Sequence, residues 1–181
     1  YGLITKTGAD VACCQHYFYD EEHQRLTTPW AYDDKVVCLS PDEAMRKMKG
    51  YDQMDEGLWN KLCRREIVVR HRMETFPFED AFVLYKYVPE AASVALCCVP
   101  LYYYYQRDGS LMHTGYTPYK AFARYKLEIL KDKAIRGTDR LETGVALYYI
   151  RKGLKLLREF GLLERSADVS EACRGVLECL H

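Results

Sequence analysis

The sequence predicts an α/β fold over residues 1–115, followed by an all-helical extension over residues 116–181. Apolar and tyrosine-rich runs at 9–19 and 93–105 have the length and composition of strands. Only helical periodicity is found after residue 115, which separates the two regions. We therefore expect a mixed sheet flanked by helices, with a helical region added at its C-terminal end.

The first part of the chain predicts alternating helices and strands. Residues 1–7 have the pattern of a helix end that a glycine stops, and residues 20–29 are polar and turn-like. Residues 32–39 predict a short strand that returns as the second arm of a hairpin. Ser40-Pro41-Asp42-Glu43 has the pattern of a capping box with proline at the first helical position, so a helix is expected from there to Gly50.

Further elements are predicted along the rest of the chain. We expect a helix over residues 55–65, a β-rich run over 66–70 and a helix over 79–87 that Pro89 closes. The strand at 93–105 should be covered on both faces, because its apolar run does not alternate with polar residues. Helices are predicted over 118–135, 138–160 and 169–180 in the extension.

The overall charge and the tyrosine content restrict the classes of partner. Basic and acidic residues number 26 each, so no single-sign field favours nucleic acid. The chain has 16 tyrosines, whose flat apolar rings and hydroxyl tips suit a sugar or base site and equally suit a half-exposed core edge.

The eight cysteines favour a reducing compartment. No C-x-x-C pair is present, and the adjacent pairs Cys13-Cys14 and Cys97-Cys98 are poorly suited to a zinc site. The uncharged run 91–106 contains Pro100 and is too short to span a bilayer. No signal peptide is recognisable, so we expect a cytoplasmic protein.

An adjacent pair of carboxylates, Glu79-Asp80, lies between an aromatic-proline segment and an amphipathic run. In the first turn of a helix, either carboxylate is stabilised in its ionised form by the helix dipole. A general base or a metal ligand requires that ionised form. The alternative is an ordinary N-cap of a core helix.

Two other segments carry candidate site residues. Trp59 and Lys61 lie on the helix predicted over 55–65. The alternative is that Trp59 and Leu62 belong to the core while Lys61 is solvated. The strand predicted to end at Tyr105 leads into a polar loop, 106–115, with Arg107 and Ser110, whose donors suit a phosphate or diphosphate. His113 follows and could bind a metal, while a turn at Asp108-Gly109 with a solvated arginine is the alternative.

A basic ridge is predicted in the extension. Arg151, Lys155 and Arg158 lie beside an apolar face of the predicted helix. This arrangement could rest on an anionic membrane surface, where a lipid-linked substrate would be found. An ordinary packed helix with a solvated side is the alternative.

These segments, taken in order, resemble the C-terminal half of the family 2 glycosyltransferases, which have the GT-A fold. The matching strings are Ala9-Asp10-Val11, Trp59-Asn60-Lys61-Leu62-Cys63-Arg64-Arg65-Glu66-Ile67, Phe78-Glu79-Asp80-Ala81-Phe82 and the run from Pro100 to Met112. The resemblance covers roughly residues 1 to 113 and implies sugar transfer from a nucleotide-sugar donor to an acceptor hydroxyl, usually with inversion. Polysaccharide or glycolipid synthesis is the setting it implies.

The resemblance also implies roles for individual residues. Asp80 corresponds to the catalytic base of the family, and Glu79 would fix the loop or touch the acceptor. Gln106, Arg107 and Ser110 would meet the donor diphosphate. Trp59 and Lys61 would lie on the acceptor side, where the partner is a sugar or lipid-linked acceptor.

The donor half of the family is not matched in this chain. Its D-x-D motif has no counterpart, since Asp33-Asp34 lies in a loop without the apolar strand that should precede it. We therefore expect this chain to be an inactive fragment of an enzyme that works at the cytoplasmic face of the membrane. The ligands of its Mg²⁺ or Mn²⁺ should lie mostly outside the chain. Two alternatives are a protein-interaction module that uses the tyrosines and the helical extension, and a thiol-based metal site. The oligomeric state is left open.

Overall fold

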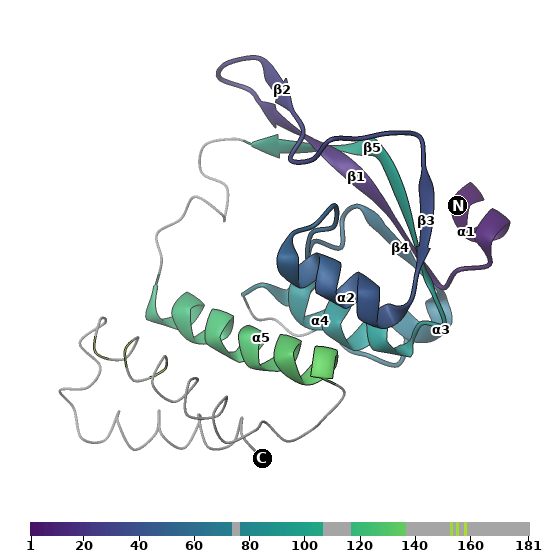
Figure 1. Cartoon of the computed structure of the whole chain (residues 1–181). Coiled ribbons are helices and arrows are strands. Elements are labelled where there is room, and N and C mark those ends of the chain that lie inside the picture. The colour runs from purple at the N-terminus through teal and green to yellow at the C-terminus, as the bar shows by residue number, and fades with distance from the viewer. Residues whose placement is uncertain (74–76, 107–116, 137–152, 154, 156–157, 159–181) are drawn as a thin grey trace. The chain divides into compact units, whose positions relative to one another are not determined.

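The computed structural model describes residues 1–73, 77–106 and 117–136, together with positions 153, 155 and 158 (Figure 1). The chain divides into two compact units, residues 1–74 with 79–114, and residues 75–78 with 115–181. The first unit is mixed α/β, as predicted. In the second, helix α5 spans Pro118–Arg136, which agrees with the helix predicted there. The loop predicted over 106–115 starts one residue later, because Gln106 still belongs to a strand. The rest of that loop, the helix at 169–180 and nearly all of the helix at 138–160 lie outside the described residues.

The sheet of the first unit has the strand order β2-β1-β5-β3, with β4 paired to β1 at the opposite end from β2. Its strands are β1 (Val11–Asp20), β2 (Arg25–Thr27), β3 (Val36–Leu39), β4 (Lys61–Cys63) and β5 (Val94–Gln106). Strands β1 and β5 are parallel and run side by side through the sheet (Figure 1), while the other three pairings are antiparallel. The β1–β5 register shifts on both sides of Gln15.

In the described part of the first unit, five short helical elements accompany this sheet. They are α1 (Gly2–Thr7), α2 (Pro41–Gly50), α3 (Arg65–Val68), α4 (Glu79–Tyr87) and the 3₁₀ turn η1 (Val88–Glu90). The core combines buried apolar side chains of α2 and α4 with those of the central strands, including Met45, Leu84, Val11 and Leu96. None of the helices within the described residues combines the length and apolar character that crossing a bilayer requires.

The start of α2 confirms the capping box read from the sequence. The Ser40 hydroxyl accepts the Glu43 N–H at 3.3 Å, and the Glu43 carboxylate accepts the Ser40 N–H at 2.8 Å. Pro41 occupies the first helical position, where its missing N–H costs no hydrogen bond. The predicted ends of α1 and α4 are likewise confirmed, with Gly8 in the left-handed conformation at φ 71°.

The helix predicted over residues 55–65 is wrong. The chain there forms a loop up to Asn60, then β4, and α3 begins only at Arg65. The Trp59 ring lies so close to Gly57 that a Cβ at Gly57 would fall 2.2 Å from the indole nitrogen. This close approach, and a buried polar network described below, outweigh the helical spacing of the apolar residues.

The β-rich run predicted over residues 66–70 is also wrong, because α3 (Arg65–Val68) occupies it. The N–H groups of Val68 and Val69 donate to the carbonyls of Arg64 and Arg65, so local helical bonds outweigh the β-propensity of the valines.

Two predictions about strand pairing are also corrected. The segment 20–29, expected to be a turn, contains β2, which forms the hairpin with β1. The strand predicted within 32–39 exists as β3 but pairs with β5 rather than returning onto β1. The sequence pattern indicates that a segment forms a strand. It does not indicate which other strand that segment pairs with, because the arrangement of the whole sheet decides the pairing.

The strand β5 is covered on both faces only in its first half. Val94, Ala95 and Leu96 are fully buried, but Tyr103 and Tyr105 are 59% and 54% exposed. Cross-strand pairs repeat along this open face, with Tyr17 stacked on Tyr103 at 5.1 Å and Tyr19 against Tyr105 at 4.7 Å. The expectation of a strand buried throughout is therefore wrong for its second half.

Replacing Ser40 by alanine should lower the free energy of unfolding by about 1 kcal/mol, because the Glu43 N–H loses its acceptor at the start of α2. Denaturant unfolding of the two proteins, compared at equal slope, measures the difference. An unchanged midpoint would contradict a stabilising role for the capping box.

Thiol reactivity should differ sharply between Cys38 and Cys13. Burial raises the pKa of the Cys13 thiol to about 12, whereas Cys38 is exposed on β3. Because the thiolate is the reactive form, alkylation mapped by mass spectrometry should modify Cys38 first and leave Cys13 intact until the protein unfolds. Equal labelling of both residues under native conditions would be the contrary result.

Candidate functional site

Asp80 lies in the first turn of α4 and is tied to a distant loop. Its Oδ2 accepts the N–H of Leu58 at 3.1 Å, and the side chain is partly buried, whereas Glu79 is exposed. Phe78, two residues earlier, has φ 67°, a conformation that is uncommon for a residue other than glycine. Backbone strain of this kind is enriched at functional sites.

The loop that Asp80 holds presents Trp59 to both central strands. The indole lies 4.7 Å from the Tyr102 ring and 5.1 Å from the Tyr104 ring of β5. It also meets the His16 ring of β1 at 4.7 Å in an edge-on arrangement. The half-buried Trp59 therefore connects the loop next to Asp80 with the C-terminal half of β5, the strand that ends at Gln106.

The side chain of Lys61, two residues after Trp59, is 0% exposed and makes three hydrogen bonds. The ammonium donates to Asp55 Oδ1 at 3.0 Å, to the Gly57 carbonyl at 2.7 Å and to Asn60 Oδ1 at 2.7 Å. These three bonds match the three protons of an ammonium group. The sequence predicts Lys61 on the acceptor side, but its ammonium group is hydrogen-bonded to other residues of the protein.

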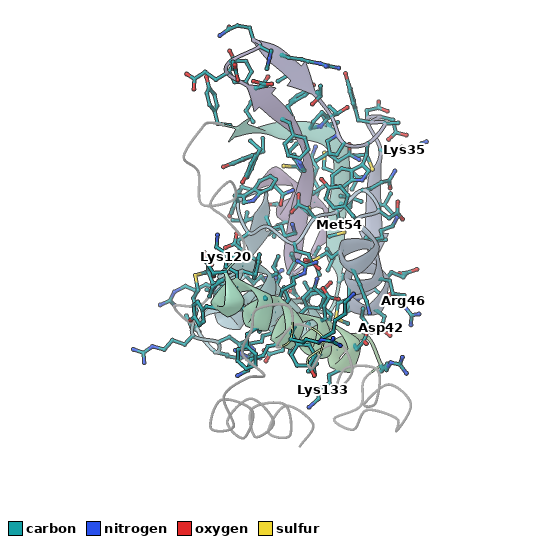
Figure 2. The ribbon with its side chains drawn as sticks, turned by 90° about the vertical axis from the view of Figure 1, so that its left-hand side faces the viewer. Lys35, Asp42, Arg46, Met54, Lys120 and Lys133 are labelled. Carbon is teal, nitrogen blue, oxygen red and sulfur yellow. The ribbon has the colours of Figure 1, made fainter. Side chains whose placement is uncertain are left out.

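Asn60 links this loop to the sheet. Its amide nitrogen donates to the Cys14 carbonyl of β1 at 2.8 Å and to Asp55 Oδ2 at 3.1 Å. The Cys14 N–H donates in return to the Asn60 carbonyl at 3.1 Å. Met54, just before the loop, is buried in the first unit (Figure 2). The loop is thus held to β1 at one end and to Asp80 at its middle.

His16 and Gln15 are both 1% exposed beside this network. His16 Nδ1 lies 3.1 Å from Asp55 Oδ2, close enough for an ion pair but without hydrogen-bond alignment. Its ring is also edge-on to Phe18 and Trp30. Among the described residues, neither His16 Nε2 nor the Gln15 amide has a hydrogen-bond partner.

The Asp55 carboxyl is the electrostatic centre of the cluster. Burial by itself would raise its pKa, but the contacts with His16 and Lys61 and the N–H of Gly57 outweigh burial and lower the pKa below its usual value. Asp55 is therefore ionised at neutral pH and acts as the anion to which Lys61, Asn60 and Gly57 converge.

Only some of the site residues predicted from the sequence come together. Asp80 and Trp59 are joined through Leu58, and Trp59 lies against the tyrosines that precede Gln106. Arg107, Ser110, His113 and Arg151 lie outside the described residues, while Lys155 and Arg158 are exposed helical residues of the second unit. Their predicted roles in donor, metal and membrane binding stay predictions.

Asp55, His16 and Gln15 are buried polar residues that sequence reasoning missed. Asp55 precedes Gly57, a pairing that indicates a turn rather than a helix and could have moved the predicted helix. His16 and Gln15 interrupt an otherwise largely apolar strand, and nothing in the local sequence identifies Asp55 as the neighbour of His16.

The divalent metal that the sequence resemblance implies has no ligand set in the part of the chain that is described. No three His, Cys, Asp or Glu side chains gather there in a way that could hold a metal ion. The six cysteines that the structure describes are free. We derive no catalytic step through a metal.

No family model matches the sequence, and no curated protein matches it at a significant level.

Replacing Asp55 by asparagine should lower the free energy of unfolding at pH 7 by about 3–5 kcal/mol, because Lys61 is left buried without its carboxylate. The exposed Lys47–Asp52 pair at 2.7 Å is a matched control, and Asp52→Asn should cost at most about 1 kcal/mol. Urea unfolding measures both. Losses of equal size would contradict a special role for the buried pair.

The Asp55 carboxyl should also make the free energy of unfolding depend on pH. The pKa of Asp55 is lower in the folded protein than in the unfolded chain, where it is about 3.9. At pH values above the unfolded pKa, Asp55 therefore stabilises the fold. This stabilisation is lost as the pH falls through the folded pKa. Unfolding measured as a function of pH should therefore show a shallower acid limb for Asp55→Asn than for the wild type.

Proposed function

We propose that this chain is the acceptor-side half of an inverting family 2 glycosyltransferase with the GT-A fold, in which Asp80 is the catalytic base. The observation that carries the proposal is the meeting of three segments far apart in sequence. Asp80 binds the Leu58 N–H, and the next residue, Trp59, packs on Tyr102 and Tyr104. A carboxylate held by the residue that precedes a tryptophan packed on two tyrosines is an arrangement that suits a sugar hydroxyl.

The chemistry assigned to Asp80 is proton abstraction. Among the described residues, its hydrogen bond uses Oδ2, which leaves Oδ1 for the acceptor hydroxyl. As that oxygen attacks the anomeric carbon, its proton passes to Oδ1 and the bond between the anomeric carbon and the diphosphate oxygen breaks. The diphosphate leaves with the bonding electrons, and attack from the opposite face inverts the anomeric centre.

The remaining roles follow the sequence resemblance. Gln106, at the end of β5, leads into the segment with Arg107 and Ser110, which would stabilise charge on the departing diphosphate. The nucleotide-sugar and its Mg²⁺ or Mn²⁺ would be bound mostly by residues beyond this chain. A sugar or lipid-linked acceptor, met at the cytoplasmic face of a membrane in polysaccharide or glycolipid synthesis, completes the proposal.

A second function, protein interaction, is favoured by the exposed tyrosine face. Tyr103 and Tyr105 of β5 and Tyr32 are each more than half exposed. Tyr17 stacks on Tyr103 and also meets Tyr32 at 6.3 Å. Tyrosine is enriched at protein interfaces because its ring buries apolar area while its hydroxyl stays hydrogen-bonded.

Asp80→Asn in the full-length protein should lower the turnover number by at least roughly 100-fold while the fold is retained. The asparagine can still accept the Leu58 N–H, but it cannot take a proton. Asp33→Asn is the matched control, because Asp33 also accepts a backbone N–H, that of Lys35 at 3.0 Å, and is exposed. Transfer is measured as release of nucleoside diphosphate, with circular dichroism to confirm folding.

Wild-type turnover in Asp80→Asn would refute the base assignment. Absence of transfer with every nucleotide-sugar tested, combined with capture of a protein partner that Tyr103→Ala abolishes, would favour the interaction function instead.

A further inference from the structure

We propose that the buried Asp55–Lys61 pair is a positioning device for Asp80, acting through the loop between them rather than by touching the acceptor. This inference rests on the proposed function for its catalytic consequence. Its structural part, that the pair fixes the Leu58 N–H against Asp80, stands on the contacts alone.

The first step is that Lys61 closes the loop on itself. Its ammonium binds Asp55, Gly57 and Asn60, which lie before, within and at the end of the loop. Asp55 Oδ1 also accepts the Gly57 N–H at 2.8 Å. One buried cation therefore sets the separation of three points on a seven-residue segment that has no regular secondary structure up to Asn60.

The second step is that this closed loop is fixed to the sheet. Asn60 shares three hydrogen bonds with Cys14 of β1. Its amide nitrogen donates to the Cys14 carbonyl, and its own carbonyl accepts the Cys14 N–H and thiol. His16, on the same strand, contacts both Asp55 and the Trp59 ring. The loop is thus fixed to β1 at this end, and on the side of α4 the Tyr85 hydroxyl also donates to Glu56 Oε1 at 3.1 Å.

The third step concerns the group that the loop presents. Leu58 lies between Gly57 and Trp59, and its N–H is the donor to Asp80 Oδ2. With the loop held by β1, this N–H is a fixed point to which the carboxylate is oriented. A shift of about 1 Å in such a group can cost roughly 100-fold in rate when it positions a catalytic residue.

The energetics agree with a positioning role. A buried ion pair often contributes no more stability than apolar side chains of the same size, because both charges lose their hydration. What the pair adds here is a unique loop geometry, since three bonds from one nitrogen admit few arrangements. We assign Asp55 and Lys61 as positioning residues on this basis.

The test replaces the pair by neutral residues of similar size in the full-length protein. Asp55→Asn combined with Lys61→Met removes both charges and leaves no buried ion unpaired. The matched control is Asp52→Asn combined with Lys47→Met, which neutralises an exposed pair of the same kind in the same unit. Two readouts are compared: amide hydrogen exchange at Leu58, and kcat and KM for transfer.

We expect Leu58 exchange to accelerate by roughly tenfold or more in the Asp55/Lys61 double variant, while the amides of β1 and β5 keep their protection. We expect kcat to fall by roughly 100-fold with little change in KM, since the acceptor is not contacted by the pair. The Asp52/Lys47 variant should match the wild type in both measurements.

Unchanged Leu58 exchange in the double variant would overturn the structural part of the proposal. Faster exchange with an unchanged kcat would overturn its catalytic part. Exchange that accelerates equally at Leu58, β1 and β5 would show general destabilisation and would also overturn it. Failure of the proposed base is read separately, from the turnover of Asp80→Asn.

Discussion

The loop conformation in the first unit depends on one interaction, the satisfaction of the buried, ionised Asp55 carboxylate. A buried charge is tolerated only when it is surrounded by donors, and this one gathers donors from Lys61, Asn60 and Gly57, with His16 close by. Satisfying Asp55 requires an irregular chain between residues 55 and 60. That irregular chain in turn gives Trp59 and the Leu58 N–H their places beside β5 and Asp80.

Local patterns predicted those elements whose signals lie within a few residues. The capping box at Ser40, the start of α4 at Glu79 and the long apolar strand β5 depend on propensity and periodicity, and they are found where expected. The prediction of a helix over 55–65 was wrong because contacts with His16 and Asp80 decide the conformation there, and helical periodicity carries no information about such contacts. The predicted pairing of β3 was wrong for the same reason.

The candidate site was partly accessible to the same reasoning. The order of Trp59, Asp80 and the tyrosines before Gln106 suggested that they belong together, and in the structure contacts join them. Lys61 shows the limit of that reasoning. A lysine on a predicted surface helix and a lysine with a fully buried side chain look identical in sequence, because only tertiary contacts decide whether the ammonium meets water or Asp55.

The parallel pairing of β1 with β5 also has a consequence for how the protein is made. Val11 is opposite Val94 and Asp20 is opposite Gln106, so the two longest strands meet only after the whole intervening chain exists. Closing so long a loop is entropically costly, and folds dominated by distant contacts assemble slowly. On the ribosome, β1 must therefore wait for β5 to emerge, exposing an apolar strand that a chaperone can shield in the meantime.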